Sequence, residues 1–435
     1  MAMVIANNID ATRSLNMVDT NSDSLSKSLQ KIASGMKIRG AADGASEYSI
    51  SEQMRKQIRS FDQANSNAQN SNSMMQTLEG ALQNTLDILK TLKERALEAA
   101  NDSDRAVYDR ETTQKDLDSF IDQIDDNANV TYNGKLMMDG RFRFKSVATM
   151  SGYMNMNLAE TTSTSDALSD LKDRAGLSLG IESTDRIALS VVNYNGTTIY
   201  KQDSSGNDYT GDTTLADLAN GRGFDWDDSN EVGFDYTGEK IYSPNGTNVL
   251  SAHASTAGVK DQIAGIAILV TDSEGNVRRN ATDILNDLVE VTRAEDGSDE
   301  HSLNFHLGPK ANHNIKVGLS DMRSQALGLR GEGGKTIDIF TQENAEAAVA
   351  TIDNAIATVV RQKGFVGAIQ SRVTAAFDNN TVARENTAAS ESVIRDADMA
   401  SEFTNYSKLN LLTQSSSMML AQANRSSSSV MDLLM

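Results

Sequence analysis

The chain has 435 residues, with 60 acidic and 40 basic side chains, no cysteine and two prolines. This length favours about two to four domains. The net charge of −20 argues against nucleic acid or an anionic membrane as the main partner, since both bind basic surfaces. The absence of cysteine excludes a disulfide framework, thiolate catalysis and cysteine-ligated zinc. Because proline interrupts helices, so few prolines favour long ones.

The N-terminus lacks the features of a targeting segment. Its first sixteen residues have neither the basic region nor the long apolar run of a secretion signal peptide. No stretch approaches the ~18 consecutive apolar residues that a membrane-spanning helix needs. We therefore expect either a cytoplasmic protein or one exported without a cleaved signal, and no membrane partner.

Both ends of the chain carry a coiled-coil pattern. Near the N-terminus, apolar residues recur at alternating intervals of four and three over more than four heptads. The C-terminal end repeats this spacing, and polar residues such as Ser22 and Thr413 interrupt both rows. The apolar seam positions are Leu15, Val18, Leu25, Leu29, Ile32 and Met36 at one end, and Leu409, Leu420, Ala423, Val430 and Leu434 at the other.

The thinness of this seam leaves two interpretations open. A buried leucine contributes only ~1.5–3 kcal/mol, against which stands the entropy of ordering the chain. The pair is either an ordinary intramolecular helical hairpin or a surface that is completed by neighbouring molecules. The polar gaps favour the second interpretation, because they leave the isolated pair weak.

More helices are predicted between the two ends. Apolar residues at helical spacing predict a helix over about 46–100 and a shorter one over about 105–127. On the C-terminal side, Thr341 is the predicted N-cap of a helix whose apolar face continues to Phe377.

Residues 146–302 differ in composition from both ends. They are rich in Gly, Asp, Asn, Ser and Thr, with short alternating runs and turn signals such as Asn195-Gly196 and Glu274-Gly275. A faint repeat leads from two strands into Leu215-Ala-Asp-Leu218, and again into Leu285-Asn-Asp-Leu288. With 26 acidic and 10 basic residues, this segment carries a net charge of −16. We expect a solvated outer insert made of two small α+β modules.

The motifs at the two ends resemble those of bacterial flagellins. Ile32-Ala-Ser-Gly-Met-Lys-Ile38 is similar to the family's Leu-x-Ser-Gly-x-Arg-Ile stretch, and Val130-Thr-Tyr-Asn-Gly134 to its Thr-x-Phe-Asn-Gly. Ser392-Val-Ile-Arg-Asp-Ala-Asp-Met-Ala400 and Leu420-Ala-Gln-Ala-Asn424 resemble its C-terminal signature. Phe305-His-Leu-Gly308 resembles one strand of its hairpin. The resemblance covers about 1–140 and 303–435. Arg39 and Gly44 depart from the family pattern.

The resemblance implies a mainly α fold with an α+β insert. Residues 1–45 and 391–435 would form the terminal coiled coil (D0). Residues 46–145 and 303–390 would form the helical domain with its β-hairpin (D1). Residues 146–302 would be the variable, surface-exposed insert (D2/D3).

The function implied by the resemblance is that of a filament subunit for swimming motility. Such subunits are secreted unfolded through the flagellar type III system and self-assemble into the extracellular filament. The implied partners are other flagellin subunits, an export chaperone, the filament cap and hook-associated proteins. Two alternatives remain: the hook–filament junction protein, which shares the terminal helices, and a flagellin with an enzymatic insert.

A search for chemistry in the sequence predicts no enzyme, cofactor or metal. The four histidines, His253, His301, His306 and His313, do not form the His-Glu-x-x-His motif of zinc proteases. The acidic runs at 225–228 and 272–275 lack the 12-residue spacing of a calcium loop and are expected to be solvated turns.

One further expectation concerns immune recognition. The Toll-like receptor that senses many flagellins grips an Arg-x-Arg-Glu-Leu stretch of the first D1 helix, with an acidic residue on the next helix. Aligned with the family, this chain has Thr91, Lys93, Glu94 and Arg95 there, and Asp116 as the acidic residue. Thr91 lacks a guanidinium and Arg95 places a charge at an apolar contact, so we expect weak receptor binding.

Overall fold

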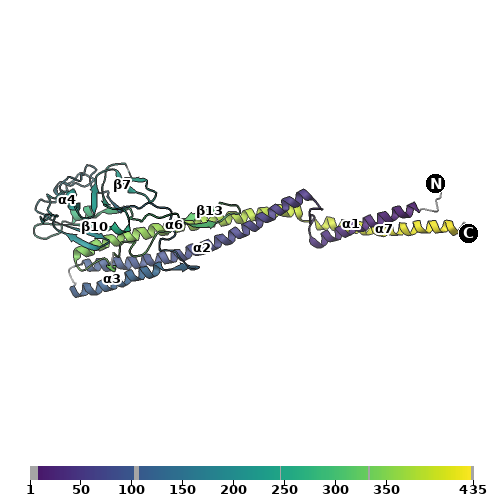
Figure 1. Ribbon diagram of the computed structural model, residues 1–435, viewed down its shortest axis with the longest axis horizontal. Coiled ribbons are helices and arrows are strands. Elements are labelled where there is room, and N and C mark those ends of the chain that lie inside the picture. Colours follow the sequence, from purple (N-terminus) through teal and green to yellow (C-terminus); the bar gives the residue numbers. More distant parts are fainter. Residues whose placement is uncertain (1–7, 102–106, 245, 332–333, 433–435) are drawn as a thin grey trace. The chain divides into compact units, whose positions relative to one another are not determined.

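The computed structural model describes residues 8–101, 107–244, 246–331 and 334–432 (Figure 1). The chain divides into two compact units. The first combines residues 1–68, 307–313 and 375–435, and the second combines 69–306 and 314–374. Both termini therefore belong to one unit, as the paired seams predict. The three-part division into D0, D1 and insert remains a prediction.

The first unit is built from helices. Helix α1 (Ile9–Ser34) and helix α7 (Met399–Asp432) lie side by side (Figure 1). Asn8 caps α1 by accepting a hydrogen bond from the Ala11 amide at 2.9 Å, and Gly35 ends it with φ +69°. The unit also holds the first part of α2 (Ala45–Ala100) and the last part of α6 (Gln342–Arg395), which Arg55 and Glu391 connect through a 2.9 Å ion pair.

The second unit begins with a helical layer. It contains the rest of α2 and α6 together with α3 (Val107–Ala128). Its fully buried apolar side chains come from all three helices, as the helical spacing in the sequence predicts: Leu82, Leu89, Leu117, Ile121, Ile352 and Val359. The Asn344 amide donates to Thr341 Oγ1 at 3.2 Å, which confirms Thr341 as the N-cap of α6.

Two hairpins accompany these helices. Strands β1 (Thr131–Tyr132) and β2 (Lys135–Leu136) meet at a turn in which Asn133 and Gly134 both have positive φ. Strands β12 (Leu303–His306) and β13 (Asn314–Val317) form the hairpin expected from the family resemblance, with Phe305 opposite Ile315.

The insert is an α+β structure. One sheet has the order β10-β4-β5, a second has the order β11-β3-β9-β6, and β7 pairs with β8. The strands are β3 (Gly152–Asn155), β4 (Arg186–Asn193), β5 (Gly196–Tyr200), β6 (Phe224–Asp227), β7 (Glu231–Phe234), β8 (Lys240–Tyr242), β9 (Leu250–Ala254), β10 (Ile263–Thr271) and β11 (Leu288–Thr292). The helices are α4 (Leu215–Ala219) and α5 (Arg279–Asn286).

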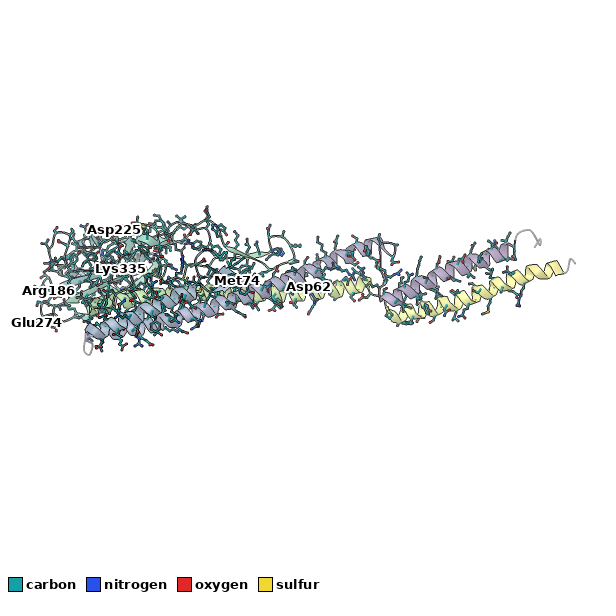
Figure 2. The ribbon with its side chains drawn as sticks, turned by 60° about the horizontal axis from the view of Figure 1, so that its bottom comes forward. Asp62, Met74, Arg186, Asp225, Glu274 and Lys335 are labelled. Carbon is teal, nitrogen blue, oxygen red and sulfur yellow. The ribbon has the colours of Figure 1, made fainter. Side chains whose placement is uncertain are left out.

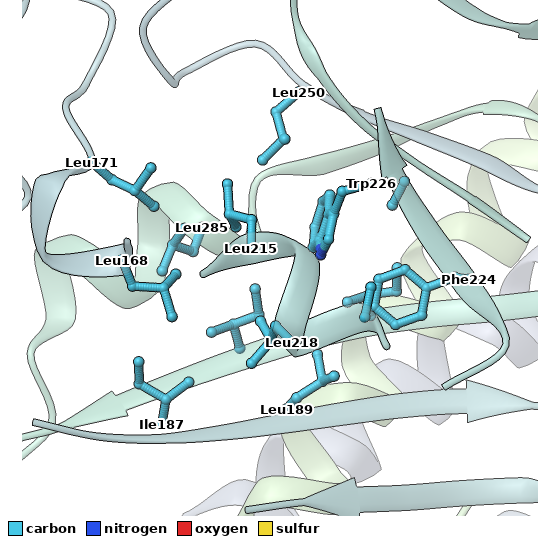
Figure 3. Close-up of a cluster of buried hydrophobic side chains, with 14 of the residues drawn as sticks. Leu168, Leu171, Ile187, Leu189, Leu215, Leu218, Phe224, Trp226, Leu250 and Leu285 are labelled. Atoms are coloured by element: carbon cyan, nitrogen blue, oxygen red, sulfur yellow. The ribbon is translucent and has the colours of Figure 1, made fainter. Parts of the chain in front are cut away.

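Most buried apolar side chains of the insert form one main core (Figure 3), and Met154, Val232 and Val249 form a smaller separate cluster. Leu189 of β4, Leu218 of α4 and Phe224 of β6 lie in the same buried cluster as Leu285 of α5. The two stretches that the sequence suggested as separate modules thus share a core. Each stretch offers only a few apolar residues, and pooling them buries more surface than two smaller cores would.

Four turns of the insert share the same Asp-x-x-Gly motif. In each, the aspartate carboxylate accepts the backbone N–H four residues later at 2.8–2.9 Å, and the glycine has φ between +83° and +93°. The turns begin at Asp173, Asp203, Asp235 and Asp272. A glycine is needed at the left-handed position because a Cβ is disfavoured there.

Candidate assembly surface

One row of the contact between α1 and α7 is polar. Asn8 Nδ2 donates to the Ala423 carbonyl at 3.2 Å, Asn21 Nδ2 donates to Ser416 Oγ at 2.8 Å, and Ser28 Oγ donates to Glu402 Oε1 at 2.7 Å. Ser28 is the one buried residue of α1, at 3 % exposure. The pair thus has hydrogen bonds where a two-helix seam normally has an apolar core.

The structure differs from the sequence prediction in which residues of α1 face α7, while the role of the seam in self-assembly remains a prediction. Val18, Leu25 and Ile32 are half-buried, as expected of one row of the heptad. The second row falls at Ser14, Asn21 and Ser28 instead of one residue later, and Leu15 and Leu29 remain 47 % and 51 % exposed. In this row, Asn21 and Ser28 hydrogen-bond to α7. A prediction from apolar residues alone therefore selects Leu15 and Leu29 as contacts of α7, although the residues one position earlier face that helix.

The remaining seam positions lie as follows. Met36 is half-buried beyond the end of α1, and on α7 the residues Leu409, Leu420 and Ala423 are half-buried. The side chains of Val430 and Leu434 lie outside the described part of the structure.

Figure 2 shows side chains projecting away from both helices along their length, and the exposed ones include large apolar residues. They are 38–69 % exposed, although they belong to residue types that are usually buried. On α1 these are Ile9, Leu15, Met17 and Leu29, and on α7 they are Met399, Phe403, Leu411, Leu412, Met418 and Met419. Exposed apolar side chains that gather on one element are typical of interaction sites, which makes the α1/α7 pair the candidate assembly surface.

The two terminal motifs of the sequence meet at the base of this pair. Met36 and Asp396 form a β-bridge, the Lys37 amide donates to the Arg395 carbonyl at 2.7 Å, and the Ala397 amide donates to the Gly35 carbonyl at 2.9 Å. These contacts tie the end of α1 to the break between α6 and α7. The register of α1 on α7 is therefore fixed by backbone hydrogen bonds as well as by side chains.

Arg395 anchors this junction with its side chain. It is 5 % exposed, lies 5.5 Å from the centre of the Tyr48 ring and forms a 2.7 Å ion pair with Glu52. The hydrogen bond from Arg395 lowers the pKa of the Glu52 carboxyl. A buried guanidinium needs such a partner, since an unpaired buried charge is costly.

The candidate receptor-facing positions lie on α2 and α3. Thr91 Oγ1 donates to the Asp87 carbonyl at 3.1 Å, Lys93 forms a 2.6 Å ion pair with Asp353 of α6, and Arg95 forms a 2.9 Å pair with Glu98. Glu94 and Asp116 are exposed. Lys93 and Arg95 thus already have acidic partners within the chain.

The acidic turns and histidines show structural roles. The Asp272 carboxylate accepts hydrogen bonds from Asn276 and Glu274, and the Asn276 side chain contributes most to lowering its pKa. Burial lowers the pKa of His253, whose Nε2 lies 2.9 Å from Ser251 Oγ. Within the described residues, no group of three or more His, Cys, Asp or Glu side chains could hold a metal ion. Likewise, no described helix has the length and apolarity needed to cross a membrane.

Comparisons with known proteins agree with these observations. A family model of the bacterial flagellin N-terminal helical region matches residues 5–143, and one of the C-terminal helical region matches residues 349–434. A flagellin from Clostridium tyrobutyricum is 31 % identical over 97 % of this chain and 99 % of its own length. A flagellar filament 30.7 kDa core protein from Treponema maltophilum is 26 % identical over 99 % of this chain and 100 % of its own length.

More distant likenesses are consistent with this result. A flagellin from Bacillus subtilis is 25 % identical over 99 % of this chain and 100 % of its own length. A flagellar hook-associated protein from Legionella pneumophila covers 78 % of this chain at 13 % identity and a TM-score of 0.34, which is too low to support an inference. On the family models and the near full-length identity to the Clostridium protein, this chain belongs to the bacterial flagellins, the subunits of flagellar filaments.

Proposed function

We propose that this flagellin polymerises through the exposed apolar faces of α1 and α7. The main observation behind this proposal is that α1 buries a polar residue, Ser28, and exposes the apolar residues Leu15 and Leu29. Burying a leucine side chain contributes ~1.5–3 kcal/mol, and in a polymer this contribution recurs in every subunit. The pair gains on assembly the apolar core that it lacks in one chain.

The proposal is tested by the variant Leu29→Ala. We expect it to give a soluble monomer that forms short filaments or none, by electron microscopy and sedimentation. Leu177→Ala is the matched control, because Leu177 is also exposed, at 67 %, but lies in the insert. Normal filaments and swimming from Leu29→Ala would show that this surface is not needed.

Export and the remaining partners form a second part of the proposal. We infer that the chain is secreted unfolded by the flagellar type III system, with an export chaperone, and joins the extracellular filament beneath a cap. The absence of cysteine suits a chain that is threaded unfolded through a channel. A weak α1/α7 pair also suits helices that become fully ordered only on assembly. Loss of secretion in a strain without a flagellar export apparatus is the expected result, and unchanged secretion would contradict the route.

Two alternatives are separated by direct observation. A hook–filament junction protein would occur in few copies, so long filaments grown from purified protein would exclude it. An enzymatic insert would show activity in a peptidase assay with and without chelator. We expect long filaments and no peptidase activity.

We also propose that the Toll-like receptor for flagellin recognises this chain weakly. Arg95 is paired with Glu98 on the α2 surface, and receptor binding at an apolar contact would have to bury or displace that pair. The double change Thr91→Arg with Arg95→Leu should raise potency in a reporter-cell titration of monomer. If the unmodified chain already equals a strongly stimulatory flagellin, the proposal is wrong.

A further inference from the structure

A cavity of about 550 Å³ lies between the insert and α6, within the second compact unit. Its volume falls in the range of about 300–1,000 Å³ that small-molecule sites occupy. Its walls are the segment after residue 142, the β7–β8 hairpin, the end of β11, the loop after β13 and one face of α6. Much of the lining is apolar or aromatic, including Phe144, Phe234, Tyr236, Ile241, Val291 and Phe365.

The walls of this cavity are fixed by the fold. Ser146 and Ser298 exchange both backbone hydrogen bonds at 3.0 Å, and the Leu319 amide donates to the Phe142 carbonyl at 2.6 Å. The Phe144 ring packs on Gly318, where a Cβ would lie 2.3 Å from ring atom Cδ2. Phe144 also stacks on Tyr236, with ring centroids 6.4 Å apart. The glycine is thus needed to seat the ring, and the aromatic wall is already formed.

Two of the three arginines that line the cavity have partners within the protein. Arg361 forms a 3.1 Å ion pair with Glu290, and Arg293 Nη2 donates to the backbone carbonyls of Asp321 and Ala326. The Asp235 carboxylate is used by its own turn. Glu295 is the other carboxylate in the lining. The cavity lining thus contains three arginines and two carboxylates, whereas the chain as a whole has a net charge of −20.

Two hydrogen-bond donors in the cavity lining lack the kind of partner that Arg293 and Arg361 have. Arg143 Nε and Gln362 Nε2 are buried, and neither has a hydrogen-bond partner among the described residues. Both residues line the cavity, Arg143 from the segment entering the insert and Gln362 from α6. A buried donor without an acceptor costs free energy, so such donors beside an apolar cavity suit a ligand that brings acceptor oxygens.

We propose that this cavity binds a small amphipathic anion. Its aromatic or branched apolar body lies among Phe144, Tyr236 and Phe365, and its carboxylate or sulfonate accepts hydrogen bonds from Arg143 and Gln362. An arginine is suited to this role because its guanidinium binds planar anionic groups through directed, charge-assisted hydrogen bonds. The site is formed by residues outside α1 and α7, so it stands independently of the proposed assembly surface.

Two fluorescent probes test the proposal on the full-length monomer. One is 8-anilinonaphthalene-1-sulfonate, and the other is N-phenyl-1-naphthylamine, which has the same aromatic body without the sulfonate. Energy transfer from Trp226, the only tryptophan of the chain, selects probe bound near the insert over probe bound at exposed apolar residues elsewhere. We expect the sulfonate to bind about tenfold more tightly than the neutral probe, as a charge-assisted hydrogen bond permits.

The variant Arg143→Met keeps an unbranched stem at this position and removes the guanidinium with its charge and donors. It should weaken sulfonate binding about tenfold and leave the neutral probe unchanged. Arg141→Met is the matched control, because Arg141 is 75 % exposed, pairs with Asp139 and does not line the cavity. Circular dichroism and the urea midpoint establish that each variant is folded.

A third variant, Ser320→Phe, places an aromatic ring in the cavity from the loop after β13, adds no second tryptophan and should abolish binding of both probes. The proposal is overturned if Arg143→Met and Arg141→Met bind the sulfonate equally. It is also overturned if both probes bind the unmodified chain equally, or if Ser320→Phe leaves both bound.

Discussion

The insert and the α1/α7 pair use apolar residues in opposite ways. The insert collects 24 buried residues into one cluster, including Leu168, Leu189 and Leu215 at 0 % exposure (Figure 3). The pair buries Ser28, and ten large apolar side chains are exposed among those that the structure describes on its two helices. The insert is therefore a folded body in a single chain, whereas we propose that the exposed apolar residues of the pair are covered on assembly. Under this proposal the same residue type stabilises the monomer in one region and the polymer in the other.

The largest expected effect comes from making the same substitution in both regions. Leu189→Ala removes a fully buried side chain of β4 and should destabilise the insert by about 2–5 kcal/mol. Leu15→Ala removes a side chain that is 47 % exposed and should change monomer stability by no more than about 0.5 kcal/mol. Urea unfolding, followed by Trp226 fluorescence for the insert and by far-UV circular dichroism for the helices, measures both.

Filament growth should rank these two variants in the reverse order. Leu15→Ala should impair polymerisation, while Leu189→Ala should still polymerise at temperatures where its insert is folded. Equal loss of polymerisation in both variants would mean that the insert and the helices do not act separately. The contrast between the two regions would then be wrong.

The sequence predicted the helices better than the way they pack. Helical spacing and the cap at Thr341 located α2, α3 and α6, because long periodic segments record which face is buried. The heptad pattern was misassigned at Leu15 and Leu29 because the contact row is polar, and hydrophobicity cannot detect a row held by Asn21 and Ser28. Short-range patterns thus fixed the elements, while the choice of partner depended on hydrogen bonds between residues about 400 positions apart.

The insert was harder to predict for a different reason. Its main core depends on which strands pair, and neighbours in the sheets such as β3 and β9 are far apart in sequence. The repeated Asp-x-x-Gly turns did carry a local signal, since each aspartate accepts the amide four residues later. The cavity at Arg143 brings together five separate segments, and no local pattern indicates that arrangement.

A smaller effect is expected where the insert contacts α6. The Glu290 side chain is 10 % exposed, accepts hydrogen bonds from Arg361 and Thr358, and has a raised pKa, chiefly because burial disfavours the charged carboxylate. A raised pKa in the folded state means that ionised Glu290 destabilises the fold above its folded pKa. This penalty disappears as the pH falls through that pKa, in a window above the ordinary value of 4.5.

Glu290→Gln should therefore raise the urea midpoint at pH 7 and lose this advantage toward pH 4.5. Arg361 is 52 % exposed, so its charge stays in water when its partner becomes neutral. Glu239→Gln changes an exposed glutamate of the same insert and should show no such trend. If Glu290→Gln is less stable than the unmodified chain at pH 7, the ion pair outweighs the burial of its charge.

The smallest effect on assembly should come from the largest change, deletion of residues 150–298. The His301 amide donates to the Arg143 carbonyl at 3.1 Å, so the two ends that remain lie side by side and residues 144–149 and 299–300 can close the loop. The α6 side chains that contact the insert include Thr351, Asn354 and Thr358, whose polar groups tolerate water once uncovered.

Surface modules between close ends tolerate excision, so the deletion variant should be secreted and should form filaments. Electron microscopy and a motility assay check this. Adding Leu29→Ala to the deletion should again prevent filament growth, which would show that both filaments depend on the same helical surface. A deletion variant that is secreted but never polymerises would place part of the assembly interface in the insert. The contrast between a self-contained insert and an incomplete helical pair would then no longer hold.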